Sequence, residues 1–544
     1  MTLAPKDALR AFLRGSLSVT GPRPGTRMSK FYITTAIDYP NHKPHIGHAF
    51  EKIGADVQAR YRRMEGDDVH FLIGNDENTV KVSKRAAELG RPVKAYVDEM
   101  AAHFKAAWAK LAISNDDFIQ TSEARHAAGC QRFIQKVFDA GFIYKKPYES
   151  LYCEGCESFK TAKDLVDGRC PNHPAQPPRT VQEENYFFAL SRFREPLLRL
   201  YAERPDFIVP ATRRNEILSL VEGGLEDVSI SRQHIDWGIR VPFDPAQTIY
   251  VWFDALLNYA TGVGYGTDEA MLGRWWPADL HVIGKDITRF HCALWPAMLM
   301  AAGVALPRRV QVHGFVLLRG EKMSKTLGNV VDPLDLADRF GADAFRYLFM
   351  RECPFTGDGE FSYDRFVSVY NADLANNLGN LHSRTISMAL RYFDGDLGTA
   401  VPPAEVLAGI DLPAVVRSYR DAMAACEYPT ALAAIWQSLL DPANRHIDRT
   451  KPFVLVKQDR EACRRVLAEL AEALRVAAVL LKPFLPATAE AVYGGFSRPV
   501  PFGAVSVASA LEAPAGAPLR VTAPLRDGKV IPLFPRIEPP AAPA

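Results

Sequence analysis

Short apolar segments of the chain alternate with segments whose apolar residues recur at helical spacing. Two of the short segments, "FYITTAI" (Phe31–Ile37) and "VHFLIGND" (Val69–Asp76), are rich in β-branched and aromatic residues, which indicates buried β-strands. Gly66 closes the segment between them, as glycine closes many helices. The apolar positions of that segment share one helical face: Phe50, Ile53, Val57, Tyr61 and Met64. The pattern therefore predicts that the chain opens with a β-α-β unit.

Three later segments have the same apolar character. They are "TIYVWFD" (Thr248–Asp254), "LHVIGKD" (Leu280–Asp286) and "VQVHGFVLL" (Val310–Leu318), and each leads to a polar residue and a helical stretch. Strands that alternate with helices form parallel sheets with helices on both faces. The predicted fold class is therefore α/β, with a Rossmann-like, doubly wound parallel sheet.

Two changes of composition divide the chain. From about Tyr144 to Ile235 it is rich in cysteine, proline, arginine and aromatic residues, which indicates an insertion that splits the sheet. After about Tyr363 strand signals disappear and amphipathic helices follow, which predicts an all-α domain. The predicted parts are an N-terminal extension (1–30), the sheet domain (31–143 and 236–310), the insertion (144–235), a linking segment (311–365), the helical domain (366–500) and an irregular tail (501–544).

Composition and charge narrow the class of protein only slightly. Hydrophobic residues make up 48% and charged residues 24% of the 544 residues, and the net charge is +2, so a nucleic-acid partner would need a local basic patch. The longest uncharged run, residues 290–307, contains histidine, proline and glycine, which favours a buried helix and turn over a membrane span. Eight cysteines do not make a disulfide framework, so a reduced, cytoplasmic protein is predicted.

The N-terminal extension has an unusual composition. Residues 1–27 contain one acidic and five basic residues together with serine, glycine and proline, a bias that transit peptides share. A disordered tail, or translation that starts at Met28, explains the same composition. These two alternatives are favoured over a transit peptide.

The strongest local signal is the spacing of cysteine and histidine in the insertion. Cys153-x-x-Cys156 and Cys170-x-x-His173 are separated by thirteen residues, and two such pairs across a hairpin supply four soft ligands in a spacing that suits tetrahedral zinc. Four protein ligands complete the coordination shell, so one structural rather than catalytic Zn²⁺ is predicted.

Two other segments have the composition of anion-binding sites. "NHKPHIGH" places His42, His45 and His48 at three-residue spacing where the first helix begins, and a metal site, an acid–base pair or an anion site would all fit. "GEKMSKTLGN" places Lys322 and Lys325 among hydroxyls and glycines. Mobile ammonium groups suit phosphates, although a solvated basic turn explains this segment equally well when it is taken alone.

Taken together, "HIGH" (His45–His48) and "KMSKT" (Lys322–Thr326) resemble the two signature motifs of class I aminoacyl-tRNA synthetases. Further stretches in the same order narrow the resemblance to the methionyl-tRNA synthetase family: "FLIGNDEN", "YCEGCESF", "YVWFDALLNY", "HVIGKDITRFHCALWPAML" and "YNADLANNLGNLHSRT". The resemblance covers about Phe31 to Pro499. It implies an aminoacyl-tRNA ligase that makes methionyl adenylate and pyrophosphate from methionine and ATP, then transfers methionine to the 3′-terminal adenosine of tRNA(Met).

The resemblance also implies which residues act on ATP. Phosphoryl chemistry of this kind depends on positioning and charge stabilisation, and a helix N-terminus favours anions. The anion alternative is therefore preferred for the histidines, and His42 is left without a role. The catalytic residues implied are His45, His48, Lys322 and Lys325, of which Lys325 is the main neutraliser of transition-state charge. The ATP-binding residues implied are Gly47, Gly284, Asp286, Lys322 and Lys325.

Two further sets follow from the resemblance. The methionine-binding residues implied are Ile37, Tyr39, Asp76, Trp252, Ala255, Leu256, Tyr259, Ile287 and His291. Within this set Asp76 is the expected partner of the substrate ammonium, and the aromatic residues suit a thioether. The anticodon-binding residues implied are Asn380, Arg384 and Phe453, of which the first two are four apart and share a helix face.

Two positions depart from the family pattern. In "DENT" (Asp76–Thr79) Asn78 stands where relatives commonly have histidine, and Phe453 stands where relatives usually have tryptophan. Asparagine still forms hydrogen bonds but carries no proton charge. Phenylalanine still stacks on a base, with less area and no N–H.

The expected partners are ATP with Mg²⁺, L-methionine and tRNA(Met), including initiator tRNA, and no membrane. No further module follows the helical domain, which favours a monomer. Three alternatives to this function remain: a class I synthetase for another amino acid, a nucleotidyltransferase that uses no tRNA, and a paralogue that binds without charging. The pocket stretches argue against the first, the insertion and helical domain against the second, and the intact lysine pair against the third.

Overall fold

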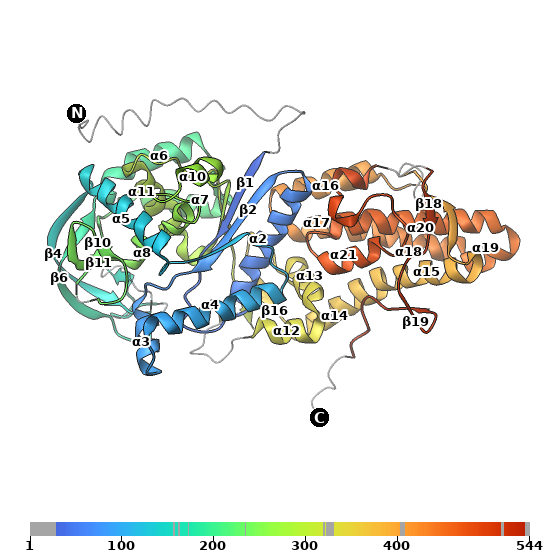
Figure 1. The fold of residues 1–544 in the computed structure, drawn as a ribbon, viewed down its shortest axis with the longest axis horizontal. Coiled ribbons are helices and arrows are strands. Elements are labelled where there is room, and N and C mark those ends of the chain that lie inside the picture. Colours follow the sequence, from blue (N-terminus) through green and yellow to red (C-terminus); the bar gives the residue numbers. More distant parts are fainter. Residues whose placement is uncertain are drawn as a thin grey trace. The chain divides into compact units, whose positions relative to one another are not determined.

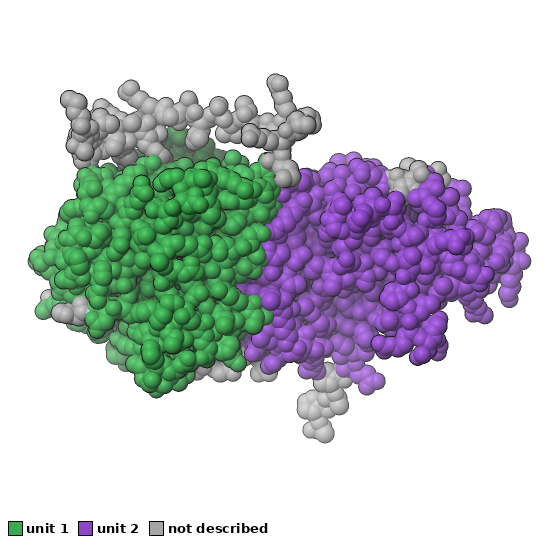
Figure 2. All heavy atoms as spheres, in the orientation of Figure 1, with its two compact units in different colours: residues 1–44, 68–107, 115–313 green, residues 45–67, 108–114, 314–544 purple. Residues whose placement is uncertain are grey.

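The structure is a computed structural model of the chain (Figure 1). It describes residues 29–155, 158–160, 164–171, 173–233, 235–318, 321–322, 331–402, 409–512 and 516–538, so the predicted extension at 1–27 lies outside it. The chain forms two compact units (Figure 2). Unit 1 comprises residues 1–44, 68–107 and 115–313, and unit 2 comprises residues 45–67, 108–114 and 314–544.

Unit 1 is built on a six-stranded sheet in which every neighbouring pair is parallel. The strand order is β3 (Asp117–Gln120), β2 (Asp68–Asn75), β1 (Lys30–Thr35), β12 (Leu280–Gly284), β13 (Val310–His313) and β7 (Ile208–Val209). From the centre of the sheet, β1, β2 and β3 follow one another toward one edge, and β12 and β13 follow one another toward the other edge. The predicted α/β fold is confirmed, and its topological switch point, where such folds bind ligands, lies between β1 and β12.

Helices that follow these strands bury their apolar faces in the unit 1 core. They are α3 (Val80–Glu88), α4 (Val93–Lys110), α5 (Ala124–Asp139), α9 (Asn258–Thr261), α10 (Glu269–Trp275) and α11 (Trp295–Ala301). Phe133 of α5 and Leu299 of α11 have no exposed surface and belong to one apolar cluster with Val312 of β13.

The strand predicted at Thr248–Asp254 is wrong for most of its length. Strand β11 (Asp244–Ile249) ends early and pairs antiparallel with β9 (Ser231–Arg232) and β10 (Arg240–Val241), outside the main sheet. Tyr250 then caps a helix, α8 (Val251–Ala255). This helix is buried on most sides, so its sequence has the continuous apolar character of a buried strand, which periodicity cannot distinguish from a helix.

The predicted insertion forms its own antiparallel sheet. The order is β5 (Ser158–Lys160), β4 (Ile143–Cys153), β6 (Arg179–Phe188) and β8 (Val228–Ser229). Helices α6 (Arg194–Glu203) and α7 (Ala211–Glu222) follow β6, and β7 between them pairs with β13. The same stretch of sequence therefore also contributes the edge strand of the parallel sheet.

Unit 2 contains the first long helix, α2 (Ile46–Met64), together with elements from the second half of the chain. The strand predicted at Val310–Leu318 is interrupted between His313 and Val316, and Gly314 at the break packs so closely on Gly357 that a Cβ would lie 1.9 Å from its carbonyl oxygen. Beyond this break, β14 (Val316–Leu318) pairs with β15 (Glu321–Lys322) and β16 (Gly359–Phe361). Helices α12 (Pro333–Phe340) and α13 (Ala342–Glu352) lie between these strands in sequence.

The rest of unit 2 is helical, as predicted. Its helices are α14 (Tyr363–Val369), η6 (Tyr370–Gly379), α15 (Asn380–Phe393), α16 (Leu412–Ala424), α17 (Tyr428–Ile435), η8 (Trp436–Leu440), α18 (Asp441–Thr450), α19 (Pro452–Gln458), α20 (Arg460–Leu481) and α21 (Pro486–Tyr493). Helix α20 is central and its apolar residues are buried. The tail is less irregular than predicted, because β18 (Pro518–Arg520) pairs with β17 (Asp396–Thr399), and β19 (Leu525–Arg526) with β20 (Lys529–Val530).

A buried ion pair fixes α2 within unit 2. Nη2 of Arg346, on α13, lies 2.6 Å from Oδ2 of Asp56, on α2, and neither side chain is exposed. The same guanidinium donates to four main-chain carbonyls, those of Leu111, Ala112, Pro483 and Phe484. Burial alone would raise the pKa of Asp56, but Arg346 and Arg60 outweigh it and lower that pKa. The pair therefore joins four stretches of the chain in one core.

No helix among the described residues has both the length and the apolar character needed to cross a bilayer.

Candidate active site

The two histidines of "HIGH" form the N-terminal cap of α2. The backbone N–H of Gly47 donates to Nδ1 of His45 at 3.1 Å, and the N–H of His45 donates to Nδ1 of His48 at 3.1 Å. The two rings stack with their centroids 3.8 Å apart. Because each Nδ1 accepts a hydrogen bond, the ring proton is on Nε2 in the neutral imidazole. Both histidines are therefore oriented as N–H donors at a helix N-terminus, which suits an anion.

Gly47 is required by this cap. A Cβ at this position would lie 2.9 Å from Cε1 of His45, so any side chain would displace the capping ring. This reason for glycine is independent of the ATP contact predicted for Gly47, which stays a prediction. His42 is exposed and precedes the cap.

The segment after the lysine pair meets the same helix end. The N–H of Ile46 donates to the carbonyl oxygen of Val331 at 3.2 Å. Of the two lysines, Lys322 has a described backbone, which pairs with Leu317 in the β14–β15 hairpin, and Lys325 lies outside the described residues. Within unit 2, the chain that leaves "KMSKT" therefore returns to the start of α2 six residues after Lys325.

In unit 1, two of the residues predicted to bind ATP, Gly284 and Asp286, lie at the end of strand β12 and in the turn after it, at the switch point. Gly284 ends the strand and is buried, and Asp286 is exposed on the short helical turn η3 (Lys285–Ile287). A Cβ at Gly284 would lie 2.9 Å from Oδ1 of Asp286. The glycine therefore leaves space for the carboxylate at the carboxyl end of the strand.

Aromatic and polar side chains contact one another beside this turn. The hydroxyl of Tyr259 and Nε2 of His291 are 2.7 Å apart, and Nδ1 of His291 is 3.1 Å from the carbonyl oxygen of Ile287. Trp252 stacks on Phe290 with ring centroids 3.8 Å apart and an angle of 2°. Four predicted methionine-binding residues therefore lie in this cluster or at its edge: Trp252, Tyr259, Ile287 and His291. Two more, Ala255 and Leu256, are buried at the end of α8.

A buried, neutral histidine lies beside this cluster. His281 of β12 is 4.4 Å, ring to ring, from Tyr259. Its Nδ1 bonds the hydroxyl of Thr34, and its Nε2 accepts from the indole of Trp295. Burial lowers the pKa of His281 well below the usual histidine value, so the group beneath Tyr259 carries no charge at neutral pH.

The predicted ammonium partner lies at the carboxyl end of β2. Asp76 is 3% exposed, and its N–H donates to the carbonyl oxygen of Asp38 at 2.9 Å. Tyr39 is half-buried, with the ammonium of Lys81 over its ring, and Ile37 packs on the apolar cluster that contains Tyr32. The loop after β1 and the loop after β2 are thus joined by their backbones.

The sequence did not predict a buried polar network beneath these loops. Nδ2 of Asn78 donates to Oδ2 of Asp254 at 3.1 Å and to the carbonyl oxygen of Thr121 at 3.1 Å. Nε2 of His126 lies 3.7 Å from Oδ1 of Asp254, and its Nδ1 bonds Thr261. Burial raises the pKa of Asp254, although His126 and Asn78 oppose the shift. The one indication in the sequence was that Asn78 stands where relatives commonly have histidine, and this did not reveal which residues Asn78 bonds.

Three of the four predicted metal ligands converge in the insertion. The ligand atoms of Cys153, Cys170 and His173 all lie within 4.8 Å of one another, and Cys156 lies outside the described residues. Sγ of Cys153 is 3.8 Å from Nδ1 of His173, close to the roughly 3.6 Å that tetrahedral zinc bonds imply. Both cysteines are buried. The donor set therefore fits a soft or borderline metal ion.

The residues predicted to read the anticodon lie on the helical part of unit 2. Asn380 and Arg384 share α15, and Arg384 is 3.6 Å from Asp448 of α18. Phe453 is the second residue of α19 and is 51% exposed, among the most exposed large apolar residues described. An exposed aromatic ring is available for stacking on a base.

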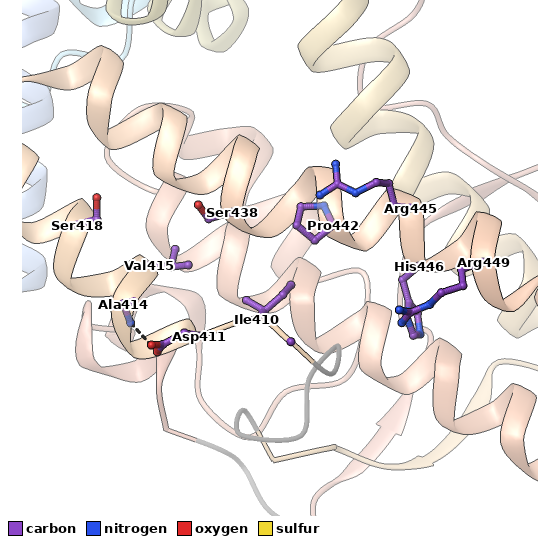
Figure 3. A pocket seen from close by; sticks show the side chains of 11 residues that line it. Ile410, Asp411, Ala414, Val415, Ser418, Ser438, Pro442, Arg445, His446 and Arg449 are labelled. Atoms are coloured by element: carbon purple, nitrogen blue, oxygen red, sulfur yellow. Dashed lines mark hydrogen bonds between the residues drawn. The ribbon is translucent and has the colours of Figure 1, made fainter.

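A pocket of about 770 Å³ lies next to α18 (Figure 3). Arg445 and Arg449 extend from successive turns of α18, and His446 lies between them. Helix α16 also lines the pocket, with its N-cap residue Asp411 and with Ser418. Helix α18 thus carries both a basic pocket lining and Asp448, the partner of Arg384.

Comparisons with known proteins agree with this arrangement. The family described as "tRNA synthetases class I (M)" matches residues 31–177 and 173–386. The methionine--tRNA ligase of Caldanaerobacter subterraneus subsp. tengcongensis is 46% identical over 471 residues, which cover 85% of this chain and 73% of the relative. That of Bacillus subtilis is 43% identical over 483 residues, with 85% and 72% covered.

A solved structure extends the similarity over nearly the whole chain. The methionyl-tRNA synthetase of Mycobacterium tuberculosis, in complex with methionyl-adenylate, superposes with a TM-score of 0.86 at 40% identity, covering 94% of this chain and all of that one. These matches confirm the resemblance read from the motifs. The chain therefore belongs to the class I tRNA synthetases, in the methionyl-tRNA synthetase family.

Proposed function

We propose that this chain is a methionine–tRNA ligase. The observation that carries the proposal is the cluster after strand β12, where His291 bonds both the hydroxyl of Tyr259 and the carbonyl oxygen of Ile287. Aromatic side chains make favourable contacts with a thioether, and the family membership of the chain supplies the reaction.

In the first step the carboxylate of methionine attacks the α-phosphorus of ATP. A carboxylate–phosphorus bond forms, the bond to the bridging oxygen breaks, and pyrophosphate leaves with the electron pair. Negative charge grows on the phosphate oxygens, so donors already in place lower the barrier. We assign this role to the Nε2–H groups of His45 and His48 and to the ammonium groups of Lys322 and Lys325.

The methionine itself is held by charge at one end and by apolar contact at the other. The carboxylate of Asp76 is the proposed partner of its ammonium group. Trp252, Tyr259 and Ile287 are the proposed walls around the thioether, with His291 at the closed end. Gly284 and Asp286 are proposed to face the ATP ribose.

In the second step a hydroxyl of the 3′-terminal adenosine of tRNA(Met) attacks the carbonyl carbon of methionyl adenylate. The ester bond forms, AMP leaves, and the hydroxyl proton goes to the released phosphate or to solvent. Asn380, Arg384 and Phe453 are the proposed readers of the anticodon, because single-stranded bases are recognised through edge hydrogen bonds and stacking. Initiator tRNA is included among the proposed substrates.

Two ions are part of the proposal. Cys153, Cys156, Cys170 and His173 would hold one Zn²⁺, which would stabilise the fold of the insertion. Mg²⁺ bound with ATP would neutralise phosphate charge. A monomeric, cytoplasmic enzyme remains the prediction for the state and location of the chain.

The test is methionine-dependent exchange of pyrophosphate into ATP, followed by charging of tRNA(Met). Exchange with methionine and not with valine, leucine, isoleucine or cysteine is expected. Exchange with one of those amino acids in place of methionine would contradict the proposal. Exchange with methionine but no charging would indicate a nucleotidyltransferase or a non-charging paralogue.

Loss of a zinc ligand should unfold the insertion locally. We expect about one zinc per chain in the wild-type protein and well under one in Cys153→Ser, with a lower melting temperature, because structural zinc contributes folding energy directly. Elemental analysis and thermal scans measure both. Cys463→Ser is the control, since Cys463 is also a buried free cysteine but lies in unit 2. A zinc-free wild type, together with unchanged melting of Cys153→Ser, would rule the site out.

Removing the exposed ring of Phe453 should weaken tRNA charging alone. Phe453→Ala should raise the KM for tRNA about tenfold, since stacking contributes about 1–3 kcal/mol per base. Pyrophosphate exchange should not change. Val454→Ala is the matched control, because Val454 is the next residue of α19 and is 40% exposed. Equal effects of the two substitutions on charging would contradict the role of Phe453.

A further inference from the structure

We propose that Asn78 is a positioning residue of the amino-acid site, which holds the turn carrying Asp76 against the helix carrying Trp252. The inference rests on the proposed function and adds a residue to it. All the groups involved lie in unit 1, and Asn78 itself is assigned no contact with substrate.

The amide of Asn78 connects two of the elements that form the amino-acid site. Asn78 lies two residues after Asp76 in the turn that follows β2. Its Nδ2 donates to the carboxylate of Asp254 at 3.1 Å, and Asp254 lies on α8 between Trp252 and Ala255. Nδ2 also donates to the carbonyl oxygen of Thr121, and this second hydrogen bond holds the amide in its orientation. One side chain thus joins the charged and the apolar halves of the site.

Loss of the hydrogen-bond donor to Asp254 should destabilise the folded structure around it. The carboxylate has no exposed surface, and among the described residues Asn78 is the one side chain that hydrogen-bonds it directly. His126 approaches Oδ1 only to 3.7 Å, and its Nδ1 is engaged with Thr261 at 2.7 Å. Because a buried carboxylate is stable only with hydrogen bonds, removal of the Asn78 amide should let α8 shift.

The shift should reach the amino-acid site and leave the ATP residues in place. Trp252 and Ala255 flank Asp254 on α8, and Tyr259 follows on α9. Gly284 and Asp286 come from β12 and η3, which make no described contact with Asn78. The expected result is therefore a selective effect on methionine.

The first experiment measures pyrophosphate exchange by Asn78→Ala over a range of methionine and of ATP concentrations. The KM for methionine should rise about tenfold, as expected for loss of a hydrogen bond to a charged group. The KM for ATP should stay within about twofold of wild type. Equilibrium dialysis of methionine without ATP should show the same loss of affinity. Asn185→Ala is the control, since Asn185 is a buried amide of unit 1 that bonds Glu183.

The second experiment uses the pH dependence of Asn78→Asp. A carboxyl at position 78 can donate to Asp254 only when one of the two carboxyls is protonated. The KM for methionine of this variant should therefore fall toward the wild-type value as the pH is lowered from about 8 to about 6, whereas the wild-type KM should change much less. Asn78→His retains an N–H donor and should recover most of the affinity.

Three results would overturn the inference. They are an unchanged KM for methionine in Asn78→Ala, equal rises in both KM values, and no dependence on pH in Asn78→Asp. If Asn78→Ala does not fold, the Asp and His variants still decide the question. Absence of methionine-dependent exchange in the wild-type protein would instead defeat the proposed function, so the two failures are distinguishable.

Discussion

Lys325→Ala should lower the rate of methionyl adenylate formation about 10²- to 10³-fold, the loss typical of one donor that faces transition-state charge. The dissociation constant of methionine should change little, because the proposed site for methionine uses other residues. Lys325 lies outside the described residues, but the chain that follows it returns to Ile46 at the start of α2. Single-turnover formation of adenylate, measured beside equilibrium binding of methionine, separates the two quantities.

Two variants sharpen this result. Lys325→Arg keeps the charge with a different geometry and should recover only part of the rate. Lys94→Ala removes an exposed lysine that pairs with Asp98 and should leave the rate unchanged. A loss of methionine binding equal to the loss of rate, with the rate of the bound complex intact, would contradict the role assigned to Lys325.

Arg346→Ala should lower the free energy of unfolding by about 3–5 kcal/mol, because it removes a fully buried partner of a buried carboxylate and leaves Arg60 as its one remaining ion-pair partner among the described residues. The variant would also remove the guanidinium that donates to the carbonyl groups of Leu111, Pro483 and Phe484. Urea denaturation followed by circular dichroism measures the loss. Arg520→Ala is the matched control, since Arg520 pairs with Asp396 in unit 2 and the two side chains are 66% and 38% exposed, and an exposed pair contributes about 0–1 kcal/mol. Equal losses in the two variants would contradict the importance of burial.

The loss of unfolding free energy caused by Arg346→Ala should also depend on pH. In the wild-type protein the pKa of Asp56 is lowered, so its contribution to stability is present above the unfolded-state pKa and is lost as the pH falls through the folded-state pKa. In the variant the pKa of Asp56 should be higher than in the wild type, because Arg346 no longer opposes the effect of burial, and protonation at acid pH should relieve the cost. The difference in unfolding free energy between the two proteins should therefore shrink as the pH falls from about 7 toward about 4.

Much of the parallel sheet could be predicted, because its central strands are buried on both faces and have continuous apolar sequences. Strands β1, β2 and β12 lie within one or two residues of their predicted positions. The same rule failed at Val251–Ala255, where a buried helix has an equally apolar sequence. Residue pattern alone did not separate the two.

The candidate site was predictable only in part. The spacing of His45 and His48 indicated a helix start, but capping by imidazole is unusual, so the reciprocal hydrogen bonds and the need for Gly47 were not foreseen. Asn78 and Asp254 are 176 residues apart. No local signal shows that an amide in a turn will face a carboxylate in a later helix, because that contact depends on how the whole unit packs.

The pairing of Asp56 with Arg346 has a consequence for synthesis of the chain on the ribosome. The two residues are 290 positions apart, and the carbonyl groups that complete the cluster belong to Pro483 and Phe484. Helix α2 leaves the exit tunnel early, and Asp56 can then already bond Arg60 and Ser114. Contacts of high sequence separation form late. The buried cluster around Asp56 is therefore completed only after Phe484 has been made, near the end of synthesis.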